Sequence, residues 1–288
     1  MSLPARATLR SRPRRPVPRP ARRRRPVPSP VPRPGAALRV FVAGLTLAVA
    51  AAPSALARSG VEVAVAVASN MADAQAELAA RFTAATGMVV RTSLGSTGQL
   101  YAQIRNGAPF DVFLSADGER PRLLEADGLA VPDSRFVYAR GRLVLLGGRG
   151  KRVRPGGADL RETDYRYLAI ANPRTAPYGA AAAQALVALG LQEVVADRIV
   201  RGETIGQAYQ YVKTGAAEWG LVALSQVRSD PAQTYWVIPE RLHDPIEQEA
   251  VLLARAAGNE AAREYVRFLA SAEARAVLEA FGYTTTRQ

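Results

Sequence analysis

Residues 89–104 read VVRTSLGSTGQLYAQI, and this stretch decides the fold because it joins a strand pattern directly to a helix pattern. The β-branched run predicts a strand over 88–94. Leu100, Tyr101 and Ile104 then fall on one face of a helix that runs to about residue 106. The turn GSTG, residues 95–98, stands between them, so the first N–H groups of this helix are left free. Such helix starts favour anions.

The same alternation of strand and helix continues from about residue 60 to the C-terminal region, and it predicts an α/β fold with open, mainly parallel sheets. We expect strands over 61–67, 88–94, 111–115, 143–146, 168–171, 199–200 and 219–224, with extended segments at 235–238 and 250–253. We expect helices over 70–85, 97–106, 119–126, 177–189, 205–214, 259–270 and 272–280.

Residues 1–57 account for almost all of the net positive charge. The chain has a formal net charge of +13, which by itself suggests a nucleic-acid partner. These residues contain twelve Arg and no Asp, Glu or Lys, which leaves 26 basic and 25 acidic residues for the rest of the chain. The part that we expect to fold is therefore near neutral, and no nucleic-acid partner is expected.

The same residues have the layout of a secretory signal. Pro and Arg fill 10–34, an apolar run covers 40–52, and Ala55-Leu56-Ala57 has the small-x-small pattern of a cleavage site. The apolar run is shorter than the ~20 residues that span a bilayer. A membrane anchor or a disordered basic arm is the alternative. We predict export to the periplasm with cleavage after Ala57.

The chain has no cysteine. We therefore expect no disulfide, no thiolate metal site and no lipid attachment to an N-terminal cysteine after cleavage. An exported chain of this kind is expected to be soluble in the periplasm.

Four junctions between a predicted strand and a predicted helix share one character. They are Ser69-Asn70, Ser96-Thr97, Pro177-Tyr178 and Thr204-Ile205. In a parallel sheet such turns lie at the carboxyl ends of the strands, where α/β proteins bind ligands. Two turns fall in the first half of the pattern and two in the second, so a ligand that contacts all four would lie between two lobes.

These turns offer N–H groups and hydroxyls but no basic side chain. No carboxylate cluster has the spacing of a cation site, and the phosphate loop GxxxxGK[ST] is absent. A small oxyanion fits this set of donors best, because a fully deprotonated oxyanion accepts hydrogen bonds at every oxygen. Protonated phosphate needs an acceptor, and Glu203 beside one turn keeps that alternative open.

Each turn taken singly has a simpler reading. Ser, Thr and Asn at helix starts are most often N-caps worth ~1 kcal/mol. Tyr178 after a proline is more often a packed aromatic, and Ile205 can offer only its backbone. The binding hypothesis therefore rests on the set of four turns.

A series of short motifs in the same order is typical of one family. The motifs are ASN at 68–70, GSTGQLYAQI at 95–104, NGAPFDVFLSAD at 106–117, NP at 172–173 with APYG at 176–179, IGQA at 205–208 and GLVAL at 220–224. In these motifs, from about Val61 to Tyr283, the chain resembles the periplasmic molybdate-binding proteins of bacterial ABC-type uptake systems.

This resemblance implies a two-lobed periplasmic binding protein of type II. Each lobe is then a mainly parallel sheet flanked by helices, the second lobe is inserted into the first, and two strands form the hinge. We place lobe 1 at 58–138 plus 240–288 and lobe 2 at 139–239, after a signal segment at 1–57.

The resemblance also implies the ligand and its contacts. The family binds molybdate, and usually tungstate, through hydroxyls and backbone N–H groups at helix starts, with no cofactor and no residue that ligates a metal cation. Carried over by motif, the contacts fall on Ser69, Asn70, Thr97, Tyr178 and Ile205, and Ser96 is the neighbour that could share the role of Thr97.

One departure from part of the family is visible in the strand at 221–223. Some members place a tyrosine hydroxyl on the anion from this strand, whereas this chain has Ala223. The chain therefore resembles the branch without that tyrosine. The family further implies a monomer that delivers its ligand to the membrane permease of an ABC transporter.

Two other functions compete with this one. A carrier of another oxyanion, such as sulfate or phosphate, would have the same fold. A secreted hydrolase would use Ser69 or Ser96 as nucleophile, with His243 as the only histidine, but no GxSxG elbow is present.

Overall fold

The structure is a computed structural model that describes residues 62–162, 164–228, 230 and 232–285. All of them belong to one compact unit, Ala55–Gln288. The predicted signal segment, residues 1–57, lies outside the described residues. Among the described helices no single one is long and apolar enough to cross a membrane, although the bent pair Pro177–Ala188 and Gln192–Arg198 passes that test of length and composition jointly.

Lobe 1 is built on a mixed sheet of five strands. They are β1 (Glu62–Ala68), β2 (Val89–Gly95), β3 (Val112–Ser115), β4 (Phe136–Gly141) and β10 (Ile246–Leu252). Their order is β2-β1-β3-β10-β4, in which β1 pairs parallel with β2 and β3, and β10 pairs antiparallel with β3 and β4.

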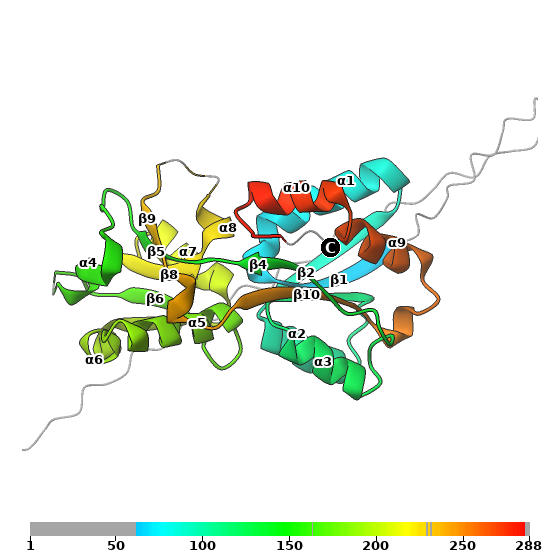
Figure 1. Ribbon diagram of the computed structural model, residues 1–288, viewed down its shortest axis with the longest axis horizontal. Coiled ribbons are helices and arrows are strands. Elements are labelled where there is room, and N and C mark those ends of the chain that lie inside the picture. The colour runs from blue at the N-terminus through cyan, green and yellow to red at the C-terminus, as the bar shows by residue number, and fades with distance from the viewer. Residues whose placement is uncertain (1–61, 163, 229, 231, 286–288) are drawn as a thin grey trace, which may run out of the picture. The chain divides into compact units, whose positions relative to one another are not determined.

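Helices cover both faces of this sheet (Figure 1). They are η1 (Ser69–Met71), α1 (Ala72–Thr86), α2 (Thr97–Arg105), α3 (Glu119–Ala126), η5 (Ala254–Ala256), α9 (Glu260–Leu269) and α10 (Ala272–Ala280). Val63, Val65 and Val67 of β1 pack into the core under α1, α9 and α10, whereas Ala66 packs into the core under α2 and α3. This alternation is the two-residue period of a strand that is buried on both faces.

Lobe 2 repeats the plan with a second mixed sheet. Its strands are β5 (Leu143–Gly147), β6 (Leu168–Ala171), β7 (Ile199–Gly202), β8 (Trp219–Ala223) and β9 (Tyr235–Val237). Their order is β7-β6-β8-β5-β9; β6 pairs parallel with β7 and β8, and β5 pairs antiparallel with β8 and β9. The helices are η2 (Pro155–Gly157), α4 (Ala158–Arg161), α5 (Pro177–Ala188), α6 (Gln192–Val195), η3 (Ala196–Arg198), α7 (Ile205–Lys213), α8 (Leu224–Val227) and η4 (Glu240–Leu242).

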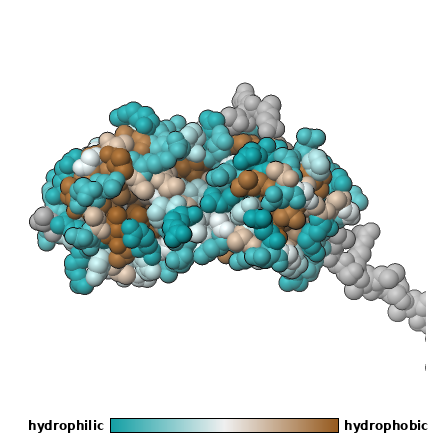
Figure 2. Space-filling view, turned by 90° about the horizontal axis from the view of Figure 1, so that it is seen from below, coloured by the Kyte–Doolittle hydropathy of each residue, from teal (hydrophilic) through white to brown (hydrophobic). Residues whose placement is uncertain are grey.

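The surface differs between the lobes on the side of α2, α3 and α5. Figure 2 shows hydrophobic residues gathered mostly over the lobe 2 half of this face. Val187 on α5 and Val194 on α6 are among the large apolar side chains that are exposed. The main core of lobe 2 lies beneath, between its sheet and its helices.

Two connections join the lobes. The chain leaves the first sheet at Gly141, enters the second at Leu143, and returns between β9 and β10. Lobe 2 is thus inserted between β4 and β10, which are paired neighbours at one edge of the first sheet. The pairing of β10 with β4 shifts register between Gln248 and Glu249, and such bulges bend a strand locally.

The α/β architecture with two sheets agrees with the prediction, but the connecting strands differ from it. The sheets are mixed because β5, β9 and β10 run antiparallel to their neighbours. No strand was predicted over β4, and β10 begins at Ile246 rather than 250. For β10 the cause is that Gln248 and Glu249 are buried polar residues, which break the apolar pattern by which a buried strand is recognised.

Candidate functional site

Four helix starts meet at one small cavity. The helices η1, α2, α5 and α7 each follow the carboxyl end of a parallel strand, and their first residues line a small cavity of about 10 Å³. Because the first N–H groups of a helix have no partner within it, four starts at one point concentrate hydrogen-bond donors there. The lining residues are Ala68, Ser69, Asn70, Gly95, Ser96, Thr97, Ala116, Ala176, Pro177, Tyr178 and Ile205. The structure therefore brings all six predicted site residues together.

Hydrogen bonds between the lobes surround this cavity. The N–H of Gly98 in α2 donates to the carbonyl of Thr175 at 2.8 Å. The N–H of Gly206 in α7 donates to the hydroxyl oxygen of Ser69 at 3.3 Å. Since each bond joins lobe 1 to lobe 2, the structure has the two lobes closed on the cavity.

The hydroxyls of Ser96 and Thr97 have different surroundings. Thr97 is buried, and its Oγ1 accepts a hydrogen bond from the N–H of Ala116 at 3.1 Å. Ser96 is the N-cap of α2, and its Oγ is buried without a hydrogen-bond partner among the described residues. Of the two side chains, Ser96 has the hydroxyl that the protein itself leaves free.

The amide of Asn70 is oriented by a chain of hydrogen bonds. Gln248 Nε2 donates to the carbonyl of Ile246 at 3.2 Å, which turns Gln248 Oε1 toward Asn70. Asn70 Nδ2 then donates to Gln248 Oε1 at 2.7 Å and to the hydroxyl of Tyr283 at 2.9 Å. The side-chain donors of Asn70 are thus used away from any ligand, and its main-chain N–H is the donor that remains at the helix start.

Sequence reasoning did not single out these supporting residues. Gln248 and Tyr283 lie 178 and 213 residues from Asn70 along the chain. Neither carries a motif, so only the fold reveals that they orient a site residue.

Tyr178 and Ile205 line the cavity but have buried side chains, so their backbones are the groups to consider there. The Ile205 side chain is buried in the core of lobe 2. The Tyr178 hydroxyl lies at the hinge, only 2.0 Å from where a Cβ on Gly141 would stand. Both residues occupy the first turn of a helix, so each has a main-chain N–H without an intrahelical partner.

The electrostatics of the cavity come from dipoles, because none of its lining residues is charged. The helix dipoles add partial positive charge at each helix start. Burial raises the pKa of Tyr178 well above its ordinary value, and the nearby Tyr283 and Tyr138 raise it further. Within the described residues no group of three or more His, Cys, Asp or Glu could hold a metal ion.

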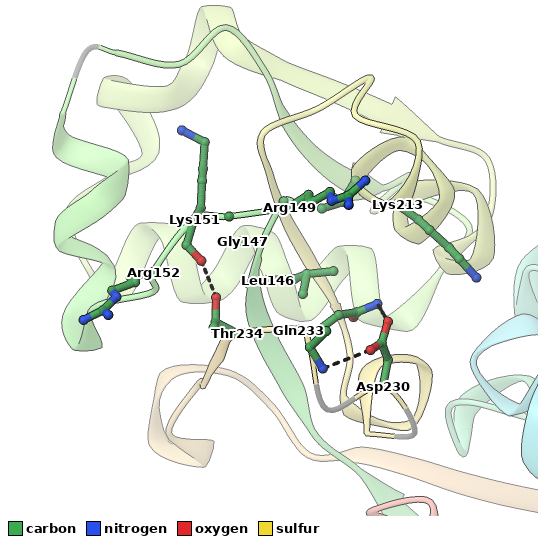
Figure 3. Close-up of a pocket in the computed structure, with 13 residues that line it drawn as sticks. Leu146, Gly147, Arg149, Lys151, Arg152, Lys213, Asp230, Gln233 and Thr234 are labelled. Carbon is green, nitrogen blue, oxygen red and sulfur yellow. Dashed lines mark hydrogen bonds between the residues drawn. The ribbon is translucent and has the colours of Figure 1, made fainter.

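A larger cavity of about 480 Å³ lies elsewhere in lobe 2 and contains none of the predicted site residues. Figure 3 shows its wall, where Thr234 donates to the carbonyl of Lys151 and Gln233 Nε2 donates to Asp230 at 3.1 Å. The side chains of Lys151 and Arg152 extend in different directions from those of Arg149 and Lys213 (Figure 3). These cations do not converge on one point, so we take the smaller cavity between the lobes as the candidate site.

Known proteins resemble this chain over most of its length. Residues 63–284 match the family described as bacterial extracellular solute-binding protein. A molybdate-binding protein of Azotobacter vinelandii is 46% identical over 242 residues, which cover 83% of this chain and 96% of the relative. The molybdate-binding protein of Rhodobacter capsulatus is 43% identical over 251 residues, which cover 87% of this chain and 96% of the relative.

A solved structure agrees with these relatives. The periplasmic molybdate-binding protein of Azotobacter vinelandii superposes with a TM-score of 0.75 at 38% sequence identity, covering 78% of this chain and 100% of that chain. The predicted two-lobed fold of type II, with one lobe inserted into the other, is thereby confirmed.

Proposed function

The chain belongs to the family of bacterial extracellular solute-binding proteins, and from this premise we propose that it captures molybdate between its two lobes and delivers it to the permease of an ABC transporter. It is a binding protein and not an enzyme, as are the two relatives named for binding molybdate. Molybdate is here the transported ligand rather than a cofactor.

One observation carries the proposal: four helix starts from two lobes converge on a cavity whose lining has no charged side chain. Hydroxyls and N–H groups can donate to every oxygen of a fully deprotonated tetrahedral anion. A metal cation would find few acceptors there. Tungstate has the same charge and the same set of acceptors, so we propose it as a second ligand.

We propose specific donors for the anion. Ser69 and Ser96 would donate through their hydroxyls, since Ser69 Oγ accepts from Gly206 and still has its own proton. Asn70, Tyr178 and Ile205 would donate through main-chain N–H groups. Thr97, whose hydroxyl oxygen already accepts from Ala116, would contribute mainly its N–H.

Phosphate is the alternative ligand that one observation favours. Asn70 Oδ1 is a buried acceptor without a hydrogen-bond partner among the described residues. Such an acceptor could take the proton of hydrogen phosphate. The lining has no carboxylate for that role, so we expect phosphate to bind more weakly than molybdate.

We also propose where the protein works in the cell. We propose that residues 1–57 direct export to the periplasm and are cleaved after Ala57, and that the mature protein works there as a monomer. A closed two-lobed form that differs from the open one gives a permease a ligand-dependent surface to recognise.

Isothermal titration of residues 58–288 with molybdate, tungstate, sulfate and phosphate tests the function. We expect one site per chain, tight binding of molybdate and tungstate, and weak or no binding of sulfate and phosphate. The absence of both heat and thermal stabilisation with molybdate and tungstate would refute the proposal. Tight binding of phosphate would instead favour the alternative.

A further inference from the structure

Asn70 is held in place by side chains from three separate segments. The Ser225 hydroxyl donates to the main-chain carbonyl oxygen of Asn70 at 2.8 Å. The hydroxyl of Tyr283 lies 3.0 Å from the same oxygen and accepts from Asn70 Nδ2 at 2.9 Å. Gln248 accepts from the same Nδ2 at 2.7 Å. Both hydrogen-bonding ends of this one residue are therefore fixed.

The number of hydroxyl protons determines which groups donate and which accept hydrogen bonds around Asn70. Ser225 and Tyr283 lie 3.1 Å apart, and each hydroxyl has a single proton. The carbonyl oxygen of Asn70 can accept from both hydroxyls, because it has two lone pairs. Burial raises the pKa of Tyr283 above its ordinary value, so its proton stays available at neutral pH.

Of the three side chains that contact Asn70, only Ser225 comes from lobe 2, and it also lies 3.1 Å from Tyr283 of lobe 1. Ser225 lies on α8, which follows directly from β8 in the sheet of lobe 2. Asn70 and Gln248 lie on elements of lobe 1, and Tyr283 follows α10 of lobe 1. Ser225 therefore reaches both Asn70 and Tyr283 only when the lobes are closed, whereas the contacts of Gln248 and Tyr283 with Asn70 lie within lobe 1.

The packing of α8 against lobe 1 supports a contact that forms when the lobes close. Arg228 Nε donates to the carbonyl of Ala280 at 3.1 Å, next to α8. A Cβ at Gly282, whose φ is +83°, would lie 2.9 Å from Leu224 at the start of α8. The end of α8 and its first residue thus both pack on the segment that carries Tyr283.

We propose that Ser225 is a positioning residue that latches the closed form. Its hydroxyl crosses from lobe 2 and holds Asn70, whose N–H faces the ligand under the proposed function on which this inference rests. In the open form Ser225 and the Asn70 carbonyl are separated, so the bond stabilises the closed state alone. A bond present in only one of two states shifts the equilibrium between them and changes ligand affinity accordingly.

The variant Ser225→Ala tests the latch, with Ser134→Ala as its matched control. Ser134 also donates from its hydroxyl to a main-chain carbonyl, that of Val131 at 2.6 Å, but entirely within lobe 1. For Ser225→Ala we expect about tenfold weaker molybdate binding, mainly through faster release, because a buried hydrogen bond is lost. For Ser134→Ala we expect unchanged affinity and a lower melting temperature.

Two further measurements separate a latch from a purely structural role. The ligand-free melting temperature of Ser225→Ala should stay within about 2 °C of wild type. The chain has no cysteine, so Val89→Cys and Val187→Cys, at exposed positions of lobe 1 and lobe 2, accept a fluorophore pair that reports the distance between the lobes. We expect Ser225→Ala to lower the closed fraction at each molybdate concentration below saturation.

Unchanged affinity with an unchanged closed fraction would overturn the latch, and so would a fall in ligand-free melting temperature as large as that of Ser134→Ala. If the wild type binds neither molybdate nor tungstate, the proposed function fails. The latch is then judged on the ligand-free protein, where Ser225→Ala must still lower the closed fraction and an equal fraction refutes it.

Discussion

Two neighbouring hydroxyls at the start of α2 illustrate how a fold separates a ligand contact from a structural one. Thr97 Oγ1 accepts from the N–H of Ala116 and so ties α2 to the end of β3. Ser96 Oγ is buried without a partner among the described residues. A buried hydroxyl left unpaired costs free energy, and an anion at the site would remove that cost.

The variants Ser96→Ala and Thr97→Val should therefore differ in kind. We expect Ser96→Ala to weaken molybdate binding by roughly 10- to 100-fold, the loss of a hydrogen bond to a charged group, with little change in ligand-free stability. We expect Thr97→Val to lower the free energy of unfolding by about 1–3 kcal/mol, because the Ala116 N–H loses its acceptor. Titration calorimetry and thermal unfolding measure the two effects; the reverse pattern would assign the anion to the Thr97 hydroxyl.

The protonation of the site residues predicts how binding depends on pH. No lining residue is charged, and burial raises the pKa of Tyr178 well above its ordinary value of 10.0. We expect the molybdate affinity to be constant between about pH 6 and pH 9, where no site group titrates. A phenol with a raised pKa in the folded state binds its proton more tightly there, so its contribution to stability is lost only as pH rises above about 10.

Titration calorimetry across this pH range in buffers of different ionisation enthalpy checks the prediction. The binding heat should show no buffer dependence, since no proton is taken up or released. A slope in affinity or a buffer-dependent heat would show that a titrating group takes part.

At the scale of elements, the hinge strand β4 and helix α5 pack so closely that Gly141 has no room for a side chain beside Tyr178. A Cβ on Gly141 would stand 2.0 Å from the hydroxyl oxygen of Tyr178 and 2.9 Å from its Cζ. Real atoms do not approach so closely, so one of the two elements must move. We expect Gly141→Ala to weaken molybdate binding by roughly 10- to 100-fold, since an overpacked contact costs about 1–3 kcal/mol in the closed form.

Three companion variants identify the cause of a loss of affinity in Gly141→Ala. Tyr178→Phe added to Gly141→Ala removes the clashing oxygen and should restore part of the affinity. Tyr178→Phe alone should bind as wild type, because the proposed contact is its N–H and its hydroxyl lies against Gly141 at the hinge; a loss would place the hydroxyl on the anion. Gly258→Ala, which has nothing within 4 Å of its Cβ, is the control for the exchange itself.

The elements also show what a sequence can and cannot predict. The strand β6 and the helices α3 and α10 have the bounds that periodicity predicts. The family resemblance implies a two-stranded hinge, but the residue pattern did not place the first half of β10, because Gln248 is fully buried there, and only its partners explain why a polar side chain is stable at that position. The latch was missed because Ser225 lies 155 residues from Asn70, and no local pattern encodes such a contact.

At the scale of the whole molecule, attraction for the anion is local rather than global. Beyond residue 57 the chain carries 26 basic and 25 acidic residues, so no strong net field draws a dianion in. Affinity must then come from closing the two lobes around donors that each lobe holds in part. A molecule of this design binds only if it can open and close.

A disulfide between the lobes tests that requirement. A Cβ on Gly206 would lie 3.5 Å from the Cβ of Ser69, at the short end of the range of about 3.5–4.5 Å for disulfides. Since the chain has no other cysteine, Ser69→Cys with Gly206→Cys can form only one intramolecular bridge. We expect the bridge to form in the closed state and to hold the lobes together.

The order of oxidation and loading should then decide the outcome. Protein oxidised without ligand should fail to take up molybdate, whereas the reduced form should bind it, more weakly than wild type because the Ser69 hydroxyl is lost. Protein loaded first and then oxidised should keep its molybdenum through desalting, by mass spectrometry of the metal, and release it after reduction. Each single variant, treated with the same oxidant, should exchange ligand freely. If the bridged, unloaded protein bound molybdate as fast as the reduced one, entry would not need the lobes to part, and the site between them would be reached by another route.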